Sequence, residues 1–232
     1  SISVLSCAIR KTIYDFPKNS LKQIDHWYKN LKKKYFVKIK TISLSHLNDW
    51  KFSKKCIYHK NKKHFSIIGV KVLSNSREVS EWEQPIIQER NLGLSGFIVK
   101  KINSTYHYLV SFSVKPGLKN PSLSCTVRTS NLKYCLKSYD HTDIEKFYLK
   151  KYFIYNKKEK IRYNKIQSDE GGRFFKSQTK NMIVEVPENK KIMINKNYIW
   201  MSHNQVLHFI KKSIFNIEAR ILFTCFNVKD IL

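Results

Sequence analysis

The stretch 167–174, QSDEGGRF, gathers the side chains of this sequence that are best suited to chemistry. The carboxylate of Glu170 can take up a proton or bind a hydroxyl group. The two glycines that follow it permit a turn and let the backbone approach a ligand closely. Arg173 offers a planar guanidinium that can bind an anion through two parallel hydrogen bonds, and Lys176 is a weaker companion. The plain alternative is a turn in which Glu170 pairs with Arg173 at the surface.

Two histidines stand in or at the end of expected strands. His107 lies within the run 106–114, and His59 ends an earlier strand. Either can serve as an acid or a base, because histidine titrates near neutral pH. A single histidine in a strand is more often a structural residue with satisfied hydrogen bonds, so this alternative stays open.

Further side chains could bind a ligand without reacting. The Trp82 ring can stack on a flat group, although a tryptophan of this kind more often belongs to the core. Gln84 carries a carboxamide that can bind a carbonyl group. Thr126, Thr129 and Ser130 come at the end of an expected strand and can donate hydrogen bonds to a ligand, or they are hydroxyls of a strand edge.

The strong positive charge of the chain limits what it binds. Lys and Arg total 44 against 17 acidic residues, which gives a formal net charge of +27. Such a charge attracts polyanions, of which a nucleic acid is the largest candidate and a nucleotide diphosphate a smaller one. The basic residues are scattered among Asn, Ile, Tyr and Phe, as an A+T-rich genome would produce. The net charge alone therefore does not tell whether the chain binds a nucleic acid, binds a nucleotide diphosphate, or is basic only because of the composition of its genome.

The cysteines favour a reducing compartment. There are five, which is an odd number, and no CxxC pair occurs, so neither a disulfide framework nor a zinc site is indicated. No apolar run is long enough to span a membrane, and the apolar start 2–9 lacks the basic leader of a signal peptide. We expect a cytoplasmic protein that has no membrane partner. The opening Ser1 in place of Met hints at a fragment or a processed chain.

Hydrophobic spacing predicts the elements that must position these residues. Ser20 is a suitable N-cap for the helix 20–34, and Ser202 for the helix 202–212. A third, short helix is expected over 141–153. Expected strands cover 35–44, 64–73, 95–101, 106–114, 123–130, 181–186 and the apolar stretch 219–228.

Several strands with about three helices indicate an α+β domain. We expect a mixed β-sheet core with flanking helices, and no linker divides the chain. The segment 3–7, SVLSC, is echoed by 221–225, ILFTC, as if the chain began at the tail of one repeat and ended at the tail of the next. The expected division is therefore a preceding tail or N-terminal strand over 1–12 and one domain over 13–232.

A series of short motifs resembles the NDP-hexose 2,3-dehydratase family, whose members usually carry two copies of one repeat. No single motif is specific, but their order and spacing together are, and they look more like the second repeat than the first. The motifs are Trp82-Glu-Gln-Pro85, Gly93-x-x-Gly96, Thr105-Tyr-His-Tyr-Leu-Val110, Cys125-Thr-Val-Arg-Thr129, Gln167-Ser-Asp-Glu-Gly-Gly-Arg-Phe174, Asn181-Met-Ile-Val-Glu185, Trp200 and Asn216-Ile-Glu-Ala-Arg220.

The resemblance implies a fold and a reaction. The fold would be similar to that of the Nudix hydrolases, without their metal-binding helix of clustered glutamates, so no metal is expected. The reaction would remove water across C2 and C3 of a dTDP-linked 4-keto-6-deoxyglucose in deoxysugar biosynthesis. The C4 ketone acidifies the C3 proton, a base takes it, and an acid assists departure of the C2 hydroxyl. No cofactor is needed, and the chain has no GxGxxG fingerprint.

The resemblance also assigns roles to the residues introduced above. Glu170, His107 and His59 become the candidate acid and base. Arg173 and Lys176 would bind the diphosphate. Trp82 would stack on the thymine or the sugar, and the remaining substrate-binding candidates are Gln84, Thr126, Thr129 and Ser130.

Departures from the family pattern leave three functions open. Arg128 stands where the family usually has Gln, and the first repeat is missing, which bears on activity more than on fold. The chain can be an active dehydratase whose homodimer supplies the missing repeat. It can also be a non-catalytic remnant that binds a nucleotide sugar. The third possibility, a basic nucleic-acid-binding protein, lacks an RNP-type run, a zinc finger or a helix-turn-helix to support it.

Overall fold

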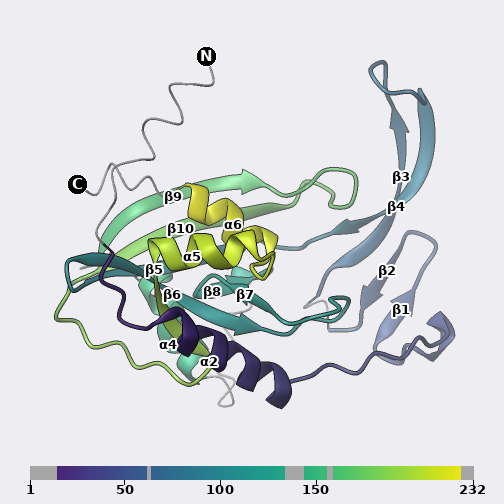
Figure 1. Ribbon diagram of the computed structural model, residues 1–232. Coiled ribbons are helices and arrows are strands. Elements are labelled where there is room, and N and C mark those ends of the chain that lie inside the picture. Colours follow the sequence, from purple (N-terminus) through teal and green to yellow (C-terminus); the bar gives the residue numbers. More distant parts are fainter. Residues whose placement is uncertain (1–14, 62–63, 134–143, 156–158, 226–232) are drawn as a thin grey trace.

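The computed structural model describes residues 15–61, 64–133, 144–155 and 159–225, with 144–147 described by their backbone alone (Figure 1). The helices are α2 (Leu21–Lys34), the 3-10 helix η1 (Leu44–His46), α4 (Ile144–Ile154), α5 (His203–Lys211) and α6 (Ile217–Thr224). The strands are β1 (Trp50–Phe52), β2 (Cys56–His59), β3 (Ser66–Leu73), β4 (Glu81–Gln88), β5 (Gly93–Ile102), β6 (Thr105–Ser113), β7 (Ser122–Ser124), β8 (Val127–Thr129), β9 (Lys160–Ser168), β10 (Gln178–Val186) and β11 (Tyr198–Ser202).

Two sheets organise the described chain. A seven-stranded sheet runs in the order β11-β6-β5-β10-β9, with β7 paired to β6 and β8 paired to β5. Its β5–β10 pair is parallel and its other pairs are antiparallel. A four-stranded antiparallel sheet, β1-β2-β3-β4, stands at one end, and its β3–β4 hairpin projects away from the body (Figure 1). The expected α+β class with a mixed sheet is confirmed.

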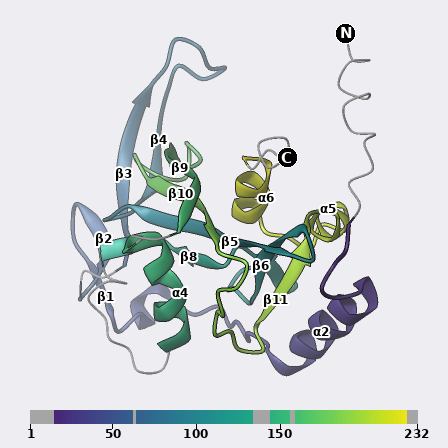
Figure 2. The ribbon, with the colours of Figure 1, turned by 90° about the vertical axis from the view of Figure 1, so that its left-hand side faces the viewer.

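Helices cover both faces of the large sheet. Figure 2 shows α4 on one side and α2, α5 and α6 on the other. Because neighbouring residues of a strand point to opposite faces, Phe97 of β5 packs in the cluster with α5 and α6, while Ile98 packs in the cluster with α4. Gly96 also faces α4, where a Cβ atom would overlap the Phe153 ring. The two faces therefore belong to two separate hydrophobic clusters.

Strand β5 changes partner halfway along its length. Its first half pairs with β8, where Gly96 lies opposite Val127, and its second half pairs with β6. Between β7 and β8 the Thr126 hydroxyl accepts a hydrogen bond from the Ile98 N–H and donates one to the Leu109 carbonyl, at 2.9 and 2.5 Å. The single strand expected over 123–130 is thus two short strands, since Thr126 spans the gap between two partner strands.

Two predicted strands are wrong. Residues 35–43 are extended but pair with no strand of the described chain, and their apolar side chains face solvent, with Phe36 70% and Ile39 61% exposed. The alternation of apolar and polar residues in this run matches the period of a strand, but it does not provide a neighbouring strand with which the run could pair. The stretch expected as a strand over 219–228 is helix α6 as far as Thr224, because Asn216 caps it and its buried residues Ala219, Leu222 and Phe223 have helical spacing. Residues 226–228 lie outside the described part.

The helix predictions are confirmed where they can be compared. Ser20 and Ser202 each form a capping box with a glutamine three residues later, Gln23 and Gln205, at the start of α2 and α5. Helix α4 matches the expected helix 141–153 from residue 144 onward, and 141–143 lie outside the described residues. The expected tail 1–12 lies outside them as well. Among the described helices, none is long and apolar enough to cross a membrane.

Candidate functional site

A cavity of about 500 Å³ opens where the parallel strands β5 and β10 begin. Arg128 on β8, Ser95 on β5 and Asn181 on β10 lie opposite one another in register, so they share one face of the sheet. Helix α6 and the 169–174 turn complete the walls. The lining residues are Glu89, Ser95, Arg128, Thr129, Ser130, Gln167, Ser168, Asp169, Glu170, Arg173, Phe174, Thr179, Asn181, Ile217, Glu218 and Ile221. We call this the sheet cavity.

Two carboxyl groups of the sheet cavity have different environments. Burial raises the pKa of Glu89, the negative charge of Asp169 raises it further, and Arg128 opposes the shift. The Asp169 carboxylate accepts a hydrogen bond of 2.9 Å from the Thr179 hydroxyl, which holds it in place. A carboxyl group with a raised pKa beside a second carboxyl group can give up a proton while its neighbour takes one. Sequence reasoning missed both: Asp169 stood inside a quoted motif, and no signal marked Glu89.

The cations of the sheet cavity are paired with acids. Arg128 on β8 forms an ion pair with Glu218 on α6, and the Lys115 ammonium lies 3.8 Å from the same carboxylate. Arg173 pairs with Glu170 within the turn, and both side chains are more than 60% exposed. This pairing is the plain alternative that the sequence left open for Glu170. Both residues nevertheless line the mouth of the cavity.

Four of the predicted site residues meet in the sheet cavity: Thr129, Ser130, Glu170 and Arg173. A fifth, Gln84 on β4, is tied to the same turn, because its Nε2 donates to the Gly172 carbonyl at 2.6 Å. Trp82 stands beside it and donates from Nε1 to the Gln84 Oε1 at 2.8 Å, but it does not line the cavity. Gln84, Glu170 and Arg173 are thus linked through the 169–174 turn.

Three other predicted residues lie away from the sheet cavity. His107 is fully buried: its Nδ1 donates to the Thr105 carbonyl and its Nε2 accepts from the Lys18 N–H, so both ring nitrogens are used in holding the chain. Thr126 is buried and bridges strands, as described above. The exposed Lys176 has a positive φ of 52° and lies over the Phe175 ring, 5.3 Å from its centroid. These contacts favour the structural alternatives for all three.

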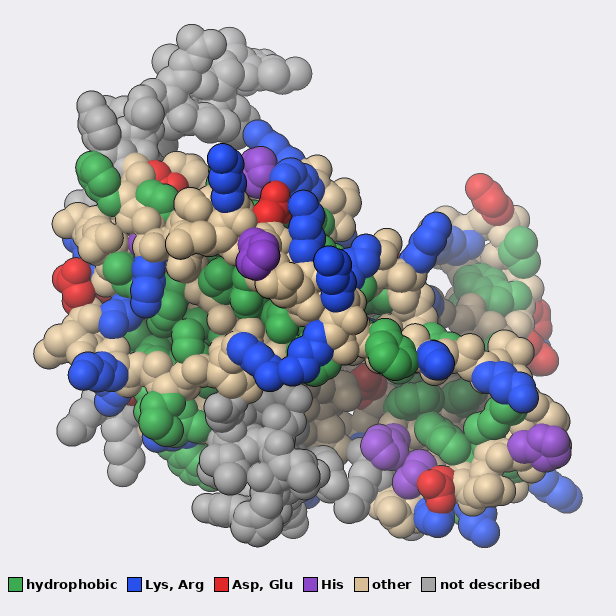
Figure 3. All heavy atoms as spheres, turned by 60° about the horizontal axis from the view of Figure 1, so that its bottom comes forward, with side chains coloured by type: hydrophobic (Ala, Val, Ile, Leu, Met, Phe, Trp, Pro, Cys, Tyr) green, Lys and Arg blue, Asp and Glu red, His purple; other side chains and the backbone are tan. Residues whose placement is uncertain are grey.

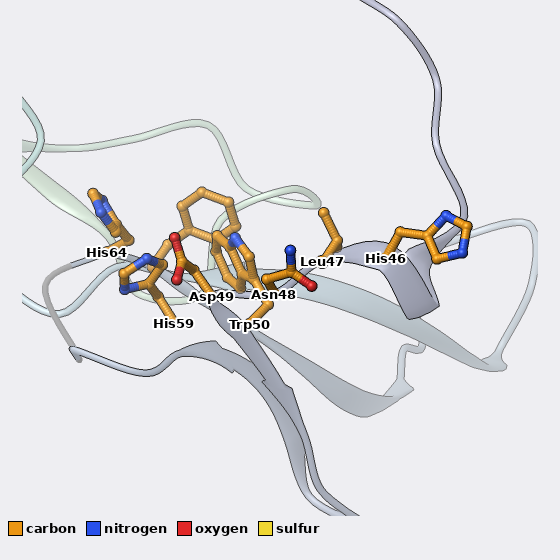
Figure 4. A pocket seen from close by; sticks show the side chains of 8 residues that line it. His46, Leu47, Asn48, Asp49, Trp50, His59 and His64 are labelled. Carbon is orange, nitrogen blue, oxygen red and sulfur yellow. The ribbon is translucent and has the colours of Figure 1, made fainter.

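His59 lines a second cavity, of about 450 Å³, on the small sheet (Figure 4). The ring centroid of Trp50 lies 5.0 Å from that of Phe65 and 5.6 Å from that of His59, and His59 contacts His64 at 4.5 Å. His46, on η1, stands apart at the far end. We call this the aromatic cavity. Of the predicted site residues, His59 is the one that lines it, so the candidate acid and base residues are divided between separate places.

Figure 3 shows basic side chains spread over one face of the molecule with few acids among them, while histidine and apolar side chains gather on the small-sheet lobe.

Within the described residues, no group of three or more His, Cys, Asp or Glu side chains is arranged to hold a metal ion. The described cysteines, Cys56, Cys125 and Cys225, are free thiols.

Solved structures that resemble the fold are Nudix hydrolases, as expected, and both their sequence identities and their TM-scores are low. An Ap4A hydrolase from C. elegans is 9% identical, with a TM-score of 0.35 over 60% of this chain and 95% of that one. A Nudix hydrolase from M. smegmatis is 7% identical, with a TM-score of 0.37 over 70% of this chain and 94% of that one.

Sequence comparison gives the family. A dTDP-4-dehydro-6-deoxy-α-D-glucopyranose 2,3-dehydratase from Saccharopolyspora spinosa is 30% identical over 92% of this chain and 43% of its own length. One from Amycolatopsis orientalis is 30% identical over 98% of this chain and 47% of its own length. The chain therefore spans about half the length of these relatives. The family model for NDP-hexose 2,3-dehydratase matches residues 21–226. The chain belongs to the NDP-hexose 2,3-dehydratase family.

Proposed function

We propose that the chain removes water across C2 and C3 of a dTDP-linked 4-keto-6-deoxyglucose in the sheet cavity. Family membership supports the reaction class. The observation that carries the site is the pairing of Glu89, whose pKa is raised, with the anchored carboxylate of Asp169 in one cavity. An elimination needs such a pair, because one group must accept a proton while another donates one.

The proposed chemistry assigns each side chain a step. Asp169 takes the C3 proton, which the C4 ketone has made acidic. The C2–O bond then breaks as Glu89 donates its proton to the leaving hydroxyl, and water departs. The enol that remains relaxes to a 3,4-diketo sugar by taking a proton at C2. Arg128 stabilises the negative charge that develops on the C4 oxygen, since a cation aimed at a developing oxyanion lowers the barrier.

Glu170 and Arg173 have a supporting role in this proposal. They sit at the mouth of the sheet cavity as an exposed ion pair. A substrate that brings its own negative charge can compete for Arg173 and leave Glu170 free to bind a sugar hydroxyl. Thr129 and Ser130, which line the same cavity, would donate hydrogen bonds to the substrate.

The test is turnover of the dTDP-4-keto-6-deoxy sugar in D₂O, with deuterium at C2 of the product read by mass spectrometry. Glu89→Gln keeps the shape of the side chain but removes its proton-donating ability, and we expect a loss in kcat of about 10²–10⁴-fold. Glu83→Gln on strand β4, six residues earlier in the chain, is the matched control, because the Glu83 side chain is exposed and lies outside the cavity. Equal activity of the two variants would contradict the assignment of Glu89.

The finer features of the proposal concern assembly and compartment. The segment 1–12 is the tail of a preceding repeat or an N-terminal strand, and 13–232 is one repeat. The proposed assembly is a homodimer, in which a second copy of the chain takes the place of the other repeat. The reaction needs no cofactor and takes place in the cytoplasm. Light scattering at several concentrations tests the dimer, and a mass equal to one chain at all of them would exclude it.

A non-catalytic remnant that still binds the nucleotide sugar is the second candidate. The observation in its favour is that the cations of the sheet cavity are already paired with acids, Arg128 with Glu218 and Arg173 with Glu170. Calorimetric binding of the dTDP sugar without any deuterium incorporation would select this function over catalysis. Retention on polyanions without nucleotide binding would instead favour the nucleic-acid alternative, which rests on the net charge of +27.

A further inference from the structure

The sheet cavity and the aromatic cavity are connected by a third cavity. This neck, of about 150 Å³, is lined by His64, Phe65, Glu89, Arg90, Thr129, Ser130 and Asn131. It shares His64 and Phe65 with the aromatic cavity, and it shares Glu89, Thr129 and Ser130 with the sheet cavity. The three cavities therefore adjoin one another between the small sheet and the carboxyl groups of Glu89 and Asp169, and we call this row of cavities the channel.

The aromatic cavity has the chemistry of a base-binding site. Half-buried Trp50 and the adjacent Phe65 expose flat apolar rings, and each base of a nucleotide has a flat face that stacks on such rings. Asn48 lines the same cavity with an exposed carboxamide. A carboxamide both donates and accepts hydrogen bonds, so it can pair with the adjacent carbonyl oxygen and N–H of a pyrimidine such as thymine.

The neck offers cationic groups between the two larger cavities. Arg90 donates from Nε to the His64 carbonyl and from a terminal nitrogen to the Ser66 hydroxyl, both at 3.2 Å. These two bonds hold the guanidinium in place, and its other N–H groups make no hydrogen bond within the described chain. A fixed guanidinium with free donors is well suited to phosphate oxygens. His64 adds a ring nitrogen on the same wall.

We propose that the channel binds a nucleoside diphosphate sugar end to end, with a pyrimidine base on Trp50 and Phe65 and the diphosphate at Arg90. The sugar then reaches the carboxyl pair of the sheet cavity. This inference rests on the proposed function, and it deepens that function by giving the nucleoside half a place on the small sheet. It assigns the stacking role to Trp50 in place of Trp82, which lines none of the three cavities.

The experiment is a calorimetric titration of the full chain with thymidine, dTDP and dTDP-glucose. Trp50→Leu removes the stacking surface, and we expect it to weaken thymidine and dTDP binding about tenfold. Arg90→Gln should weaken dTDP binding by a similar factor and leave thymidine binding within about twofold, because thymidine has no phosphate. The Glu89→Gln variant tests the proposed function separately, because it should lose turnover of the 4-keto sugar and keep its affinity for dTDP.

Matched controls separate a local effect from a folding defect. Phe52→Leu replaces an exposed aromatic residue of the same strand β1 that lines none of the three cavities, and it should leave dTDP affinity unchanged. Asn48→Ala alters an exposed side chain for which the structure shows no hydrogen bond, so it should bind thymidine more weakly without changing Tm. Photo-crosslinking with 5-iodo-deoxyuridine diphosphate, followed by peptide mapping, should label the segment 46–65.

The outcomes are distinguishable. If the wild-type chain binds dTDP but the Trp50, Arg90 and Asn48 variants bind it equally well, or if the crosslink maps outside 46–65, this inference is overturned and the proposed function stands. If the chain binds dTDP as expected here but never turns over the 4-keto sugar, the base site is supported and the catalytic proposal fails. If wild type binds no nucleotide, both are overturned.

Discussion

The two sheets differ in how much of each is buried. On the large sheet, helices cover both faces, and most positions of β5, β6 and β10 are fully buried. On the small sheet, Ser66 of β3 and Ile86 of β4 are the buried residues among its four strands, and Leu73 is 73% exposed. The large sheet therefore holds its shape through its own core. The small sheet is held together mainly by hydrogen bonding between its strands.

Truncating one isoleucine on each sheet, fully buried on the large sheet and half-buried on the small one, should give the largest contrast. Ile98→Ala on β5 empties space between the sheet and α4, and we expect about 2–5 kcal/mol of lost unfolding free energy. Ile68→Ala on β3, a half-buried site, should cost about 1 kcal/mol. Urea unfolding followed by circular dichroism measures both. Equal losses would mean that the small sheet carries as much of the stability as the large one.

Hydrogen exchange offers a second way to sharpen the comparison. Amides of β1 to β3 should exchange faster than those of β5 and β10, because fewer buried contacts oppose local opening. Saturating dTDP should slow exchange in the small sheet, since a ligand that binds only the closed form stabilises it. Mass spectrometry of the peptide 46–65 gives the measurement. Protection confined to the large sheet would contradict the placement of the base.

The pH dependence of stability should come in part from the buried His107 on the large sheet. Burial lowers the pKa of His107 below its ordinary value of 6.5, so the folded protein binds this proton less readily than the unfolded chain. Its contribution to stability is then present above about pH 6.5 and is lost as the pH falls below that value. Thermal unfolding between pH 5 and 8 (roughly the titration range of histidine) tests this. His107→Gln should flatten the slope.

The smallest expected effect concerns the N-cap of α5. Ser202→Ala removes the hydroxyl that accepts from the Gln205 N–H and donates to the Asp15 carboxylate at 2.6 Å. A lost N-cap costs about 0.5–2 kcal/mol. Unfolding in urea should show this loss without any change in dTDP affinity, because α5 lies away from the channel lining. A change in the dTDP affinity of Ser202→Ala would contradict the expectation that α5 acts on stability alone.

The sequence by itself determined the features that depend on nearest neighbours. Ser20 and Ser202 with their glutamines predicted where two helices begin, and the alternation in 64–73, 95–101 and 106–114 predicted three strands, because caps and periodicity act over a few residues. The motif 167–174 predicted where ligand-binding groups would gather, and Glu170 and Arg173 do line the sheet cavity.

Only the tertiary structure decided which distant residues meet. The run 35–44 alternates like a strand but finds no partner edge, and the apolar stretch from 219 onward folds as a helix because Asn216 caps it and its buried residues have helical spacing. Glu89 ends up beside Asp169 although 80 residues separate them, and burial together with the negative charge of Asp169 raises its pKa. Trp50 and Arg90 likewise reach one channel through the pairing of the small-sheet strands and through the neck. Such pairings depend on long-range packing, which local sequence patterns do not encode.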